Sequence, residues 1–365
     1  MSRTTWLALS PRDTVLVRDG RQFDAGVDAT AESGSPTPNT VAGAVGAAYG
    51  RRVDAVRGPV LARSSAGSQV IGSAVGEPVT AGWTAYFPTP RDLVVPDLTP
   101  DVVRRLRPEP AAGVTDLTDR ADRPLWTLTG DGEPLEGWLP GPTLSGYLRG
   151  ELFGSGRAAR RELRGHLDRE RPPLVAEARV GLARTTSRTA RTGYLYQSTH
   201  LRPADGWAFL AECDLPDDLA GEPASPVKLG GRDRLADIWT VSGPPWPRWP
   251  PGATAFPDRR VLVYLATPAV WLTGWRLPPP PGARLVAAAV AGPQPVATAT
   301  PGPRFGDSRR LQWAAPAGSV YLLEFDDAGR AAQWAAEWHG KAYGEGPLPD
   351  LRTAGFGVVL IGVWS

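Results

Sequence analysis

Two segments of the chain place a proline and a short polar residue ahead of a run of small and apolar residues, which is the pattern of a capped helix. In the first, residues 35–49, the side chain of Asn39 or Thr40 can accept a hydrogen bond from an unpaired backbone N–H. Apolar residues then recur at helical spacing, and they are Val41, Ala44, Val45 and Ala48. Residues 142–153 repeat the pattern. Because a strand precedes the first helix, two such units predict an α+β fold with a duplicated βαββαβ plan.

A basic turn stands between that strand and the first helix. Residues 9–23 have the pattern of a strand that runs into a turn containing Arg18 and Arg21. The unpaired N–H groups and the positive dipole end of a helix N-terminus suit a phosphate. Arg18, Arg21, Asn39 and Thr40 are therefore predicted to form a phosphate site. The alternative is an ordinary strand–loop–helix unit that binds nothing.

The composition bounds the class of protein. The chain has 365 residues, of which 42% are hydrophobic and 21% are charged, so it is long enough for two domains with a buried core. It contains no run of 18 apolar residues and no secretory signal pattern, and we expect a cytoplasmic protein without a membrane span. Cys213 is the only cysteine, which excludes an internal disulfide and a cysteine-based zinc site.

Positive charge is concentrated in one part of the sequence. Residues 149–202 contain twelve arginines and five acidic residues, an excess of seven, whereas the net charge of the whole chain is only +2. Such a concentration is typical of a protein that binds a polyanion. In residues 157–171 acids alternate with bases, and a solvated helix face explains them. Residues 179–202 contain five arginines and no acid, and they are predicted to contact the polyanion.

The strongest candidate site lies within this second stretch. Alternation around two tyrosines predicts a strand or a long hairpin. Arginines neutralise phosphates, and tyrosines two residues apart share one face of a strand and can stack on bases. The residues predicted to bind RNA here are Arg179, Arg184, Arg188, Arg191, Tyr194 and Tyr196. The alternative for the tyrosines is a place in the core, and the consensus of a standard RRM strand is absent.

Two glycine-containing segments are further candidates for RNA contact. Residues 227–234 form a basic glycine turn in which Lys228 and Arg232 suit a phosphate, although a plain hairpin turn explains them too. Gly355 and Gly357 belong to a glycine loop that permits close backbone approach. That approach can be to RNA or to a neighbouring element of the fold.

A proline-rich segment is the candidate for a protein contact. Residues 243–257 are too rich in proline for a helix or a strand. Trp246 and Trp249 lie within this segment, which cannot easily reach a core. Because aromatic anchors in such loops are typical of interfaces, both are predicted to bind a partner.

Residues for catalysis or metal binding are scarce. The three histidines, His166, His200 and His339, are far apart in the sequence, and there is no metal-ligand spacing, nucleophile elbow or phosphate loop. We therefore expect no catalytic residue, no metal and no cofactor. His200 is the one histidine near basic residues, and it is the candidate general acid or base if the chain cuts RNA.

Several motifs, in the same order, resemble those of subunit 3 of the type III-B CRISPR effector (Cmr) complex, a family of the RAMP superfamily. They are PRDT and RDGRQF in residues 11–23, PTPNTVAG in 36–43, EARVGLAR in 177–184, TGYLY in 192–196, VKLGGR in 227–232, GSVY in 318–321 and the glycines of 355–362. The resemblance covers essentially the whole chain. It implies tandem ferredoxin-like (RRM-like) domains with loop and hairpin insertions, one in residues 1–206 with the basic hairpin and one in residues 207–365 with the glycine loop.

The resemblance also implies a function. A member of this family is expected to be non-catalytic and to bind RNA, holding the 5′ tag of the crRNA at the foot of the complex. It would contact the large polymerase-like subunit and the repeated backbone subunit, and target RNA only indirectly, in antiviral defence. Two alternatives stay open. One is a RAMP endonuclease that processes precursor crRNA through His200, and the other is a scaffold whose arginine surplus reflects a GC-rich genome.

Overall fold

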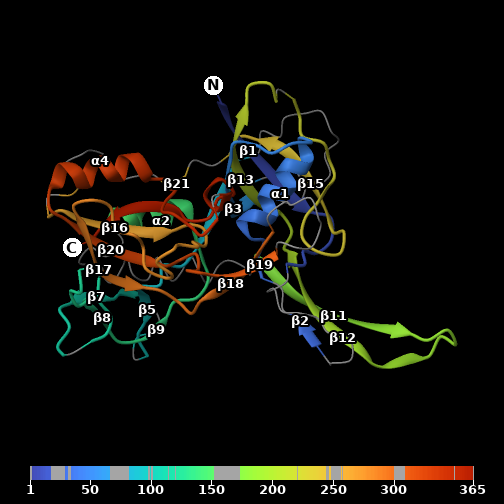
Figure 1. Cartoon of the computed structure of the whole chain (residues 1–365), viewed down its shortest axis with the longest axis horizontal. Helices are drawn as coiled ribbons and strands as arrows, with labels where there is room; N and C mark the ends of the chain where they lie inside the picture. Colours follow the sequence, from blue (N-terminus) through green and yellow to red (C-terminus); the bar gives the residue numbers. More distant parts are fainter. Residues whose placement is uncertain are drawn as a thin grey trace. The chain divides into compact units, whose positions relative to one another are not determined.

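In the computed structural model the chain folds into two compact units, and each unit is assembled from three segments of the sequence (Figure 1). Unit 1 comprises Met1–Trp83, Pro172–Gly243 and Pro295–Trp313, and unit 2 comprises Thr84–Arg171, Pro244–Gln294 and Ala314–Ser365. The structure describes residues 2–17, 29–31, 34–65, 82–97, 99, 102–113, 115–119, 121–151, 173–219, 221–243, 246–247, 256, 258–299, 309–348 and 350–364. A single domain boundary between residues 206 and 207, expected from the sequence, stays a prediction.

Unit 1 is built on an antiparallel sheet with the strand order β3-β13-β1-β15-β14. The strands are β1 (Ser2–Pro11), β3 (Ala55–Ser64), β13 (Trp207–Pro216), β14 (Val227–Lys228) and β15 (Leu235–Val241). Helix α1 (Pro38–Ala48) follows β1 and starts with a proline, where no N–H is needed. The four apolar residues that set its predicted helical spacing are all buried, which confirms this helix.

Unit 2 contains a second antiparallel sheet, with the strand order β17-β20-β16-β22-β21. The strands are β16 (Arg260–Leu265), β17 (Ala283–Ala289), β20 (Val320–Phe325), β21 (Lys341–Ala342) and β22 (Val358–Val363). Helix α4 (Ala328–Trp338) covers one face, where Trp334 shares a core with Val261 and Ile361. Asp327 caps this helix by accepting a hydrogen bond from the Arg330 backbone N–H at 2.9 Å.

The two sheets share one strand order. If β1, β3, β13 and β15 are counted as the first to fourth strands of unit 1, the order across the sheet is second, third, first, fourth, and β16, β17, β20 and β22 repeat it in unit 2. A βαββαβ unit needs two helical crossovers. Within the described residues, only the first crossover of unit 1 (α1) and only the second of unit 2 (α4) is helical. The α+β class is confirmed, and the tandem ferredoxin-like arrangement stays a prediction.

The remaining elements lie in the long connections. Strands β11 (Leu174–Arg184) and β12 (Ala190–Pro203) form a hairpin, to which β2 (Ala29–Ala31) adds a parallel strand. Strands β18 (Gln294–Ala299) and β19 (Arg309–Ala314) form a two-stranded ribbon. The others are β4 (Trp83–Pro88), β5 (Leu93–Val95), β6 (Arg104–Arg105), β7 (Arg107–Glu109), β8 (Thr127–Thr129), β9 (Glu133–Pro134), β10 (Trp138–Pro140), α2 (Gly141–Leu148) and α5 (Asp350–Thr353).

The helix expected over residues 142–153 corresponds to α2, whose buried side chains include Leu144, Tyr147 and Leu148. Within the described residues this helix ends at Leu148, where Arg149 takes the C-cap position and Gly150 the left-handed conformation, with φ 74°. No helix of the described ranges is long and apolar enough to cross a membrane.

Candidate nucleic-acid interface

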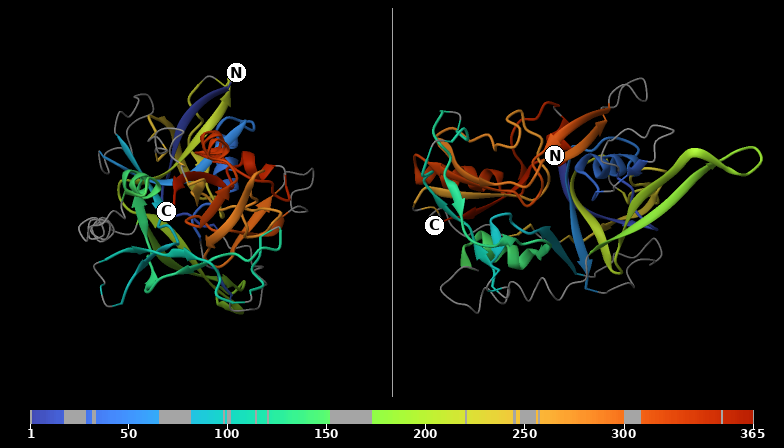
Figure 2. Two further views of the ribbon diagram at one scale, coloured as in Figure 1. Left: turned by 90° about the vertical axis from the view of Figure 1, so that its left-hand side faces the viewer. Right: turned by 90° about the horizontal axis from the view of Figure 1, so that it is seen from below.

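The β11–β12 hairpin carries the arginines that the sequence singled out, and it extends away from the sheet of unit 1 (Figures 1 and 2). Near its tip Arg184 lies opposite Ala190. The turn is closed by the Thr185 backbone N–H, which donates to the Thr189 carbonyl oxygen at 2.9 Å. The predicted strand or hairpin is thus confirmed. The exposed arginines at and beside its tip are Arg184, Arg188 and Arg191, and none forms an ion pair with an acid that the structure describes.

One of the two predicted tyrosines is paired with an arginine. The Arg191 guanidinium lies over the Tyr194 ring, with Cζ 3.9 Å from the ring centroid. This cation–π pair covers one face of the tyrosine. Because bases stack on arginine planes as well as on aromatic rings, the pair offers one combined stacking surface. The side chain of Tyr196 lies outside the described residues.

The hairpin also exposes apolar side chains that the sequence analysis did not single out. Val180 is 67% exposed and Leu182 is 46% exposed. They are two residues apart, so both lie on one face of β11, and the register of the hairpin shifts between Leu182 and Arg184. The signal was present in the sequence as an alternation of apolar and small residues. An apolar residue in a strand normally indicates a core, so this pattern alone does not predict exposed side chains.

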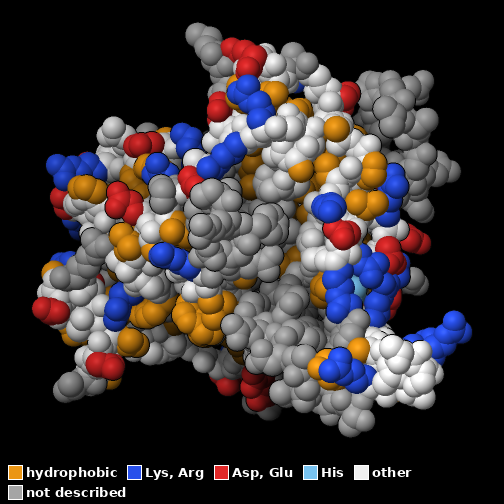
Figure 3. Space-filling model, turned by 45° about the vertical axis from the view of Figure 1, so that its right-hand side comes forward, with side chains coloured by type: hydrophobic (Ala, Val, Ile, Leu, Met, Phe, Trp, Pro, Cys, Tyr) orange, Lys and Arg blue, Asp and Glu red, His pale blue; other side chains and the backbone are white. Residues whose placement is uncertain are grey.

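The base of the hairpin holds a cluster of opposite charges, which we call the hairpin-base cluster: Asp13, Glu177, Arg179, Arg202 and Arg234. The Asp13 carboxylate accepts hydrogen bonds from Arg179, Arg202 and Arg234 at 2.9, 2.8 and 2.7 Å. Glu177 accepts from Arg179 and Arg202 at 2.7 and 2.8 Å. Basic side chains with acids at their edge gather beside the hairpin in Figure 3. Arg179, predicted to bind RNA, is therefore already committed to two carboxylates.

The acids of this cluster are held in their charged form. Burial disfavours ionisation of Asp13, but hydrogen bonds from Arg179 and Arg202 outweigh it, and the pKa of Asp13 is lowered. Hydrogen bonds from Arg202 and Arg179 likewise lower the pKa of Glu177. The sequence could not indicate the pairs of Asp13, since Asp13 and Arg179 are 166 positions apart. The Glu177–Arg179 pair joins residues only two positions apart on β11, and this local spacing could have indicated it.

His200 lies inside unit 1 next to this cluster. It is 1% exposed, and its Nδ1 forms a hydrogen bond of 2.9 Å with the Thr14 hydroxyl. Burial, with the positive charges of Arg179 and Arg234 nearby, lowers the pKa of His200. The imidazole is therefore almost fully covered by neighbouring residues.

The basic glycine turn packs on the segment that follows β1. The Gly231 backbone N–H donates to the Leu16 carbonyl oxygen at 2.7 Å, and a Cβ on Gly230 would lie 2.6 Å from that oxygen. Lys228 forms an ion pair with Asp233 at 2.5 Å. Arg232, the second predicted contact, has a positive φ of 58°. The glycines are explained by this close backbone approach.

The start of α1 differs in detail from the prediction. Thr37, rather than Asn39 or Thr40, is the N-cap residue, and no side chain caps the helix. The helix begins at Pro38, so Asn39 and Thr40, the two predicted caps, lie within its first turn. There Asn39 donates to the Ala297 carbonyl oxygen at 3.0 Å, and the Thr40 hydroxyl bonds that of Thr37 at 2.9 Å. Arg18 and Arg21, like residues 157–171, lie outside the described residues.

The C-terminal glycine loop uses its backbone groups within unit 2. The Gly357 N–H donates to the Pro268 carbonyl oxygen at 2.8 Å, and the Gly355 carbonyl oxygen accepts from the Thr267 hydroxyl at 2.7 Å. Gly357 has φ 77°, and a Cβ there would lie 3.0 Å from the Tyr343 carbonyl oxygen. Of the two roles that the sequence left open, these contacts favour packing.

Trp246 is half-buried and lies against unit 2. Its ring centroid is 6.1 Å from that of Phe87, and its Cδ1 would lie 3.5 Å from a Cβ on Gly340. The next residue, Pro247, is held in place by a hydrogen bond between its carbonyl oxygen and His339 Nε2, at 2.7 Å. The expectation that this segment cannot easily reach a core is therefore wrong for Trp246, whose ring lies near the buried Phe87. Trp249 lies outside the described residues.

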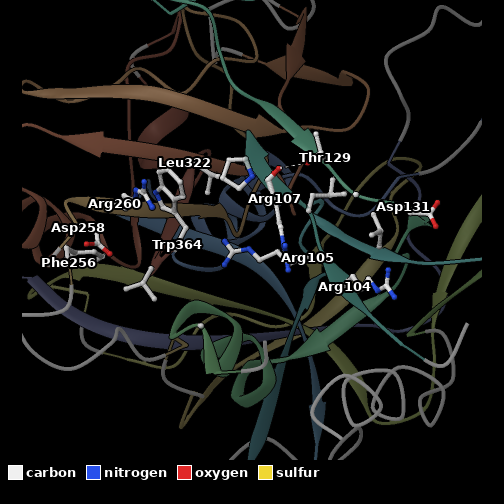
Figure 4. Close-up of a pocket in the computed structure, with 16 residues that line it drawn as sticks. Arg104, Arg105, Arg107, Thr129, Asp131, Phe256, Asp258, Arg260, Leu322 and Trp364 are labelled. Carbon is white, nitrogen blue, oxygen red and sulfur yellow. Dashed lines mark hydrogen bonds between the residues drawn. The ribbon is translucent and has the colours of Figure 1, made fainter. Parts of the chain in front are cut away.

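Unit 2 contains a pocket that sequence reasoning missed (Figure 4). It has a volume of about 780 Å³, and four arginines line it: Arg104, Arg105, Arg107 and Arg260. Arg105 Nε donates to Asp92 at 2.7 Å, and Arg260 lies over the Trp364 ring at 4.7 Å. In the described part of the chain, no three His, Cys, Asp or Glu side chains gather as a metal site would require.

The chain is similar to a protein family in sequence and to chains of solved structures. Residues 7–364 match the model of the family described as CRISPR-associated protein (Cas_Cmr3). No curated protein matches the chain by sequence. A chain in the cryo-EM structure of the Type III-B Cmr-beta bound to cognate target RNA and AMPPnP is similar with 12% identity and a TM-score of 0.49, over 87% of this chain and 86% of that one. A chain of Cmr-beta bound to cognate target RNA has 12% identity, a TM-score of 0.47 and the same coverage.

Proposed function

Because the chain belongs to the Cas_Cmr3 family of CRISPR-associated proteins, we propose that it is a non-catalytic, RNA-binding subunit of a type III-B Cmr complex in antiviral defence. In this proposal it holds the 5′ tag of the crRNA in the cytoplasm. It bridges the large polymerase-like subunit to the repeated backbone subunit and meets target RNA only indirectly. The family and the shared strand order also support treating both units as ferredoxin-like domains.

The observation that carries the RNA-binding part is the division of charge along the hairpin. At the base, Arg179 and Arg202 are neutralised by Asp13 and Glu177. At the tip, three exposed arginines have no acidic partner among the described residues. Contacts between arginines and phosphates supply most of the sequence-independent affinity of a protein for nucleic acid. The tip is therefore the part of the hairpin that is available to an RNA backbone.

The burial of His200 supports the non-catalytic part. A general acid or base must reach the proton that it transfers, directly or through one water. The His200 ring is buried in unit 1, and its Nδ1 bonds Thr14. These contacts argue against the endonuclease alternative.

A binding and cleavage assay with the full-length chain tests the proposal. Precursor crRNA with its natural 5′ tag and a precursor with a scrambled tag are incubated with the wild type and with His200→Ala, with and without Mg²⁺. We expect tighter binding of the tagged RNA and no cutting by either protein. Cutting by the wild type that disappears in His200→Ala would favour the endonuclease alternative. Absence of binding to both RNAs would favour the scaffold alternative.

A further inference from the structure

Asp13 is the point at which three arginines from three separate segments meet. Arg179 belongs to β11, Arg202 to β12, and Arg234 directly precedes β15. All three donate to the one carboxylate, at distances between 2.7 and 2.9 Å. Asp13 itself lies just after β1. The carboxylate therefore ties both strands of the hairpin to the sheet of unit 1.

The three guanidinium groups need this carboxylate to lie together. Like charges a few ångströms apart repel one another. Water screens this repulsion only in part, because the side chain of Arg234 is 26% exposed and that of Asp13 is 40% exposed. Glu177 compensates for Arg179 and Arg202 but has no described contact with Arg234. Asp13 is the acid that joins the sheet side of the cluster to the hairpin side.

Among the residues that the structure describes, few other backbone hydrogen bonds attach the base of the hairpin to the rest of unit 1. Val15 exchanges two backbone hydrogen bonds with Leu201, at 2.8 and 3.0 Å. Beyond this bridge, β11 and β12 pair with each other and with the three residues of β2. A change in the ion pairs at the base is therefore transmitted along two long strands to the tip.

We propose that Asp13 is a positioning residue for RNA binding: it holds three arginines together and so fixes the base of the hairpin whose tip contacts RNA. The inference rests on the proposed RNA-binding function. The expected effect of neutralising Asp13 on RNA affinity is opposite to the effect that charge alone would have. Removing a negative charge beside a polyanion site ordinarily strengthens binding. Neutralising Asp13 is expected to weaken it, because the arginines lose their common partner.

The test compares two acid-to-amide variants of the full-length chain. Asp13→Asn removes the common partner, and Asp237→Asn is the matched control, because the side chain of Asp237 is 39% exposed, close to the 40% of Asp13, and pairs with Arg12, which is not a member of the cluster. Binding of a single-stranded crRNA is measured over a range of salt concentrations. We expect Asp13→Asn to weaken binding about fivefold, the size that the loss of partly exposed ion pairs allows. Asp237→Asn should leave binding unchanged or slightly stronger, and Asp13→Glu, which keeps the charge, should restore most of the affinity.

The opposite sign would overturn the proposal. If Asp13→Asn binds RNA more tightly and the slope of log K against log salt steepens by about 0.7, the freed arginines have simply gained a phosphate. Glu177→Gln provides a second variant, and it should weaken binding in the same direction by a smaller factor. An unchanged melting temperature in each variant shows that the fold is intact.

A second readout separates this inference from the proposed function. Hydrogen exchange of the free protein is followed at the amides of β11 and β12. Faster exchange in Asp13→Asn than in Asp237→Asn is expected, and it would support the positioning role even if the wild type failed to bind RNA. Equal exchange in the two variants would contradict it, whatever the RNA affinity of the wild type.

Discussion

Units 1 and 2 share a strand order but differ in where their arginine side chains lie and in whether these are paired with acids. In unit 1 the β11–β12 hairpin, inserted between the second and third strands, presents three exposed arginines without a described acidic partner. In unit 2 several arginines are paired, among them Arg284, whose Nε donates to Glu324 at 2.7 Å, and Arg105, whose Nε donates to Asp92 at 2.7 Å. Arg104 and Arg107 are exposed and line the pocket of this unit. The shared strand order therefore does not determine function, because the elements outside the sheets place arginines at a hairpin tip in unit 1 and around a pocket in unit 2.

The two units also differ in how their key segments are held. The hairpin base in unit 1 depends on partly exposed ion pairs, which salt screens. In unit 2 His339 Nδ1 accepts from the Ile361 backbone N–H at 3.0 Å, and its Nε2 donates to the Pro247 carbonyl oxygen at 2.7 Å. Both ring nitrogens are thus used by the neutral imidazole. Salt should weaken the ion pairs at the hairpin base of unit 1, and acid should weaken the contacts of His339 in unit 2 as well as those of His200 in unit 1.

The largest expected effect concerns the glycine loop. Gly357→Ala should lower the free energy of unfolding by about 2–3 kcal/mol, because it adds a side chain to a left-handed residue facing a carbonyl oxygen at 3.0 Å. Gly43→Ala is the matched control in α1: a Cβ there meets no atom within 4 Å, and it should stabilise by about 0.5–1 kcal/mol. Urea unfolding measures both. If the Gly357→Ala protein is fully stable but binds RNA more weakly, the glycine loop contacts RNA.

Trp246 gives the next largest effect. Because its ring packs near Phe87, Trp246→Ser should destabilise the protein by about 1–3 kcal/mol, as expected for a half-buried aromatic side chain. Trp313, which is 58% exposed in unit 1, is the control, and Trp313→Ser should change stability by less than about 0.5 kcal/mol. If Trp246→Ser keeps full stability and only the assembly of the complex suffers, the tryptophan is a partner contact, as the sequence predicts.

The two buried histidines predict a response to acid. Burial lowers the pKa of His200 and of His339, so between their folded values and the ordinary value near 6.5 the unfolded chain binds more protons. Stability is therefore complete above this range and is lost as the pH falls through it. The urea midpoint should be lower at pH 5.5 than at pH 7.5. The double variant His200→Gln, His339→Gln should show a smaller difference, and an equal difference would contradict the assignment.

The smallest effect is expected at the start of α1. Replacing Asn39 and Thr40 together by alanine should cost about 1 kcal/mol or less, since their side chains bond Ala297 and Thr37 but do not cap the helix. RNA affinity should fall by no more than about twofold. A much larger loss of affinity at unchanged stability would show that the helix start holds a phosphate.

Local patterns in the sequence identified elements well, and contacts between distant residues poorly. The spacing of Val41 and Ala44 was enough to place α1, and the alternation around Tyr194 was enough to place the hairpin. The count of arginines without acids in residues 179–202 misjudged Arg179, because one of its partners, Glu177, lies two residues before the counted range and the other, Asp13, comes from another part of the fold. The pocket of unit 2 escaped notice for the same reason, since its arginines come from β6, β7 and β16.

The most direct test of the account compares two sets of arginines. Arg184, Arg188 and Arg191 are replaced by alanine in one variant, and three exposed arginines of unit 2, Arg104, Arg107 and Arg352, in the other. The slope of log K against log salt is measured for crRNA. We expect the hairpin variant to lose about 0.7 of slope per phosphate contact, about 2 in total, at an unchanged melting temperature, while the unit 2 variant keeps the wild-type slope. An unchanged slope in the hairpin variant, or an equal loss in both, would contradict the claim that unit 1 presents its charge to RNA.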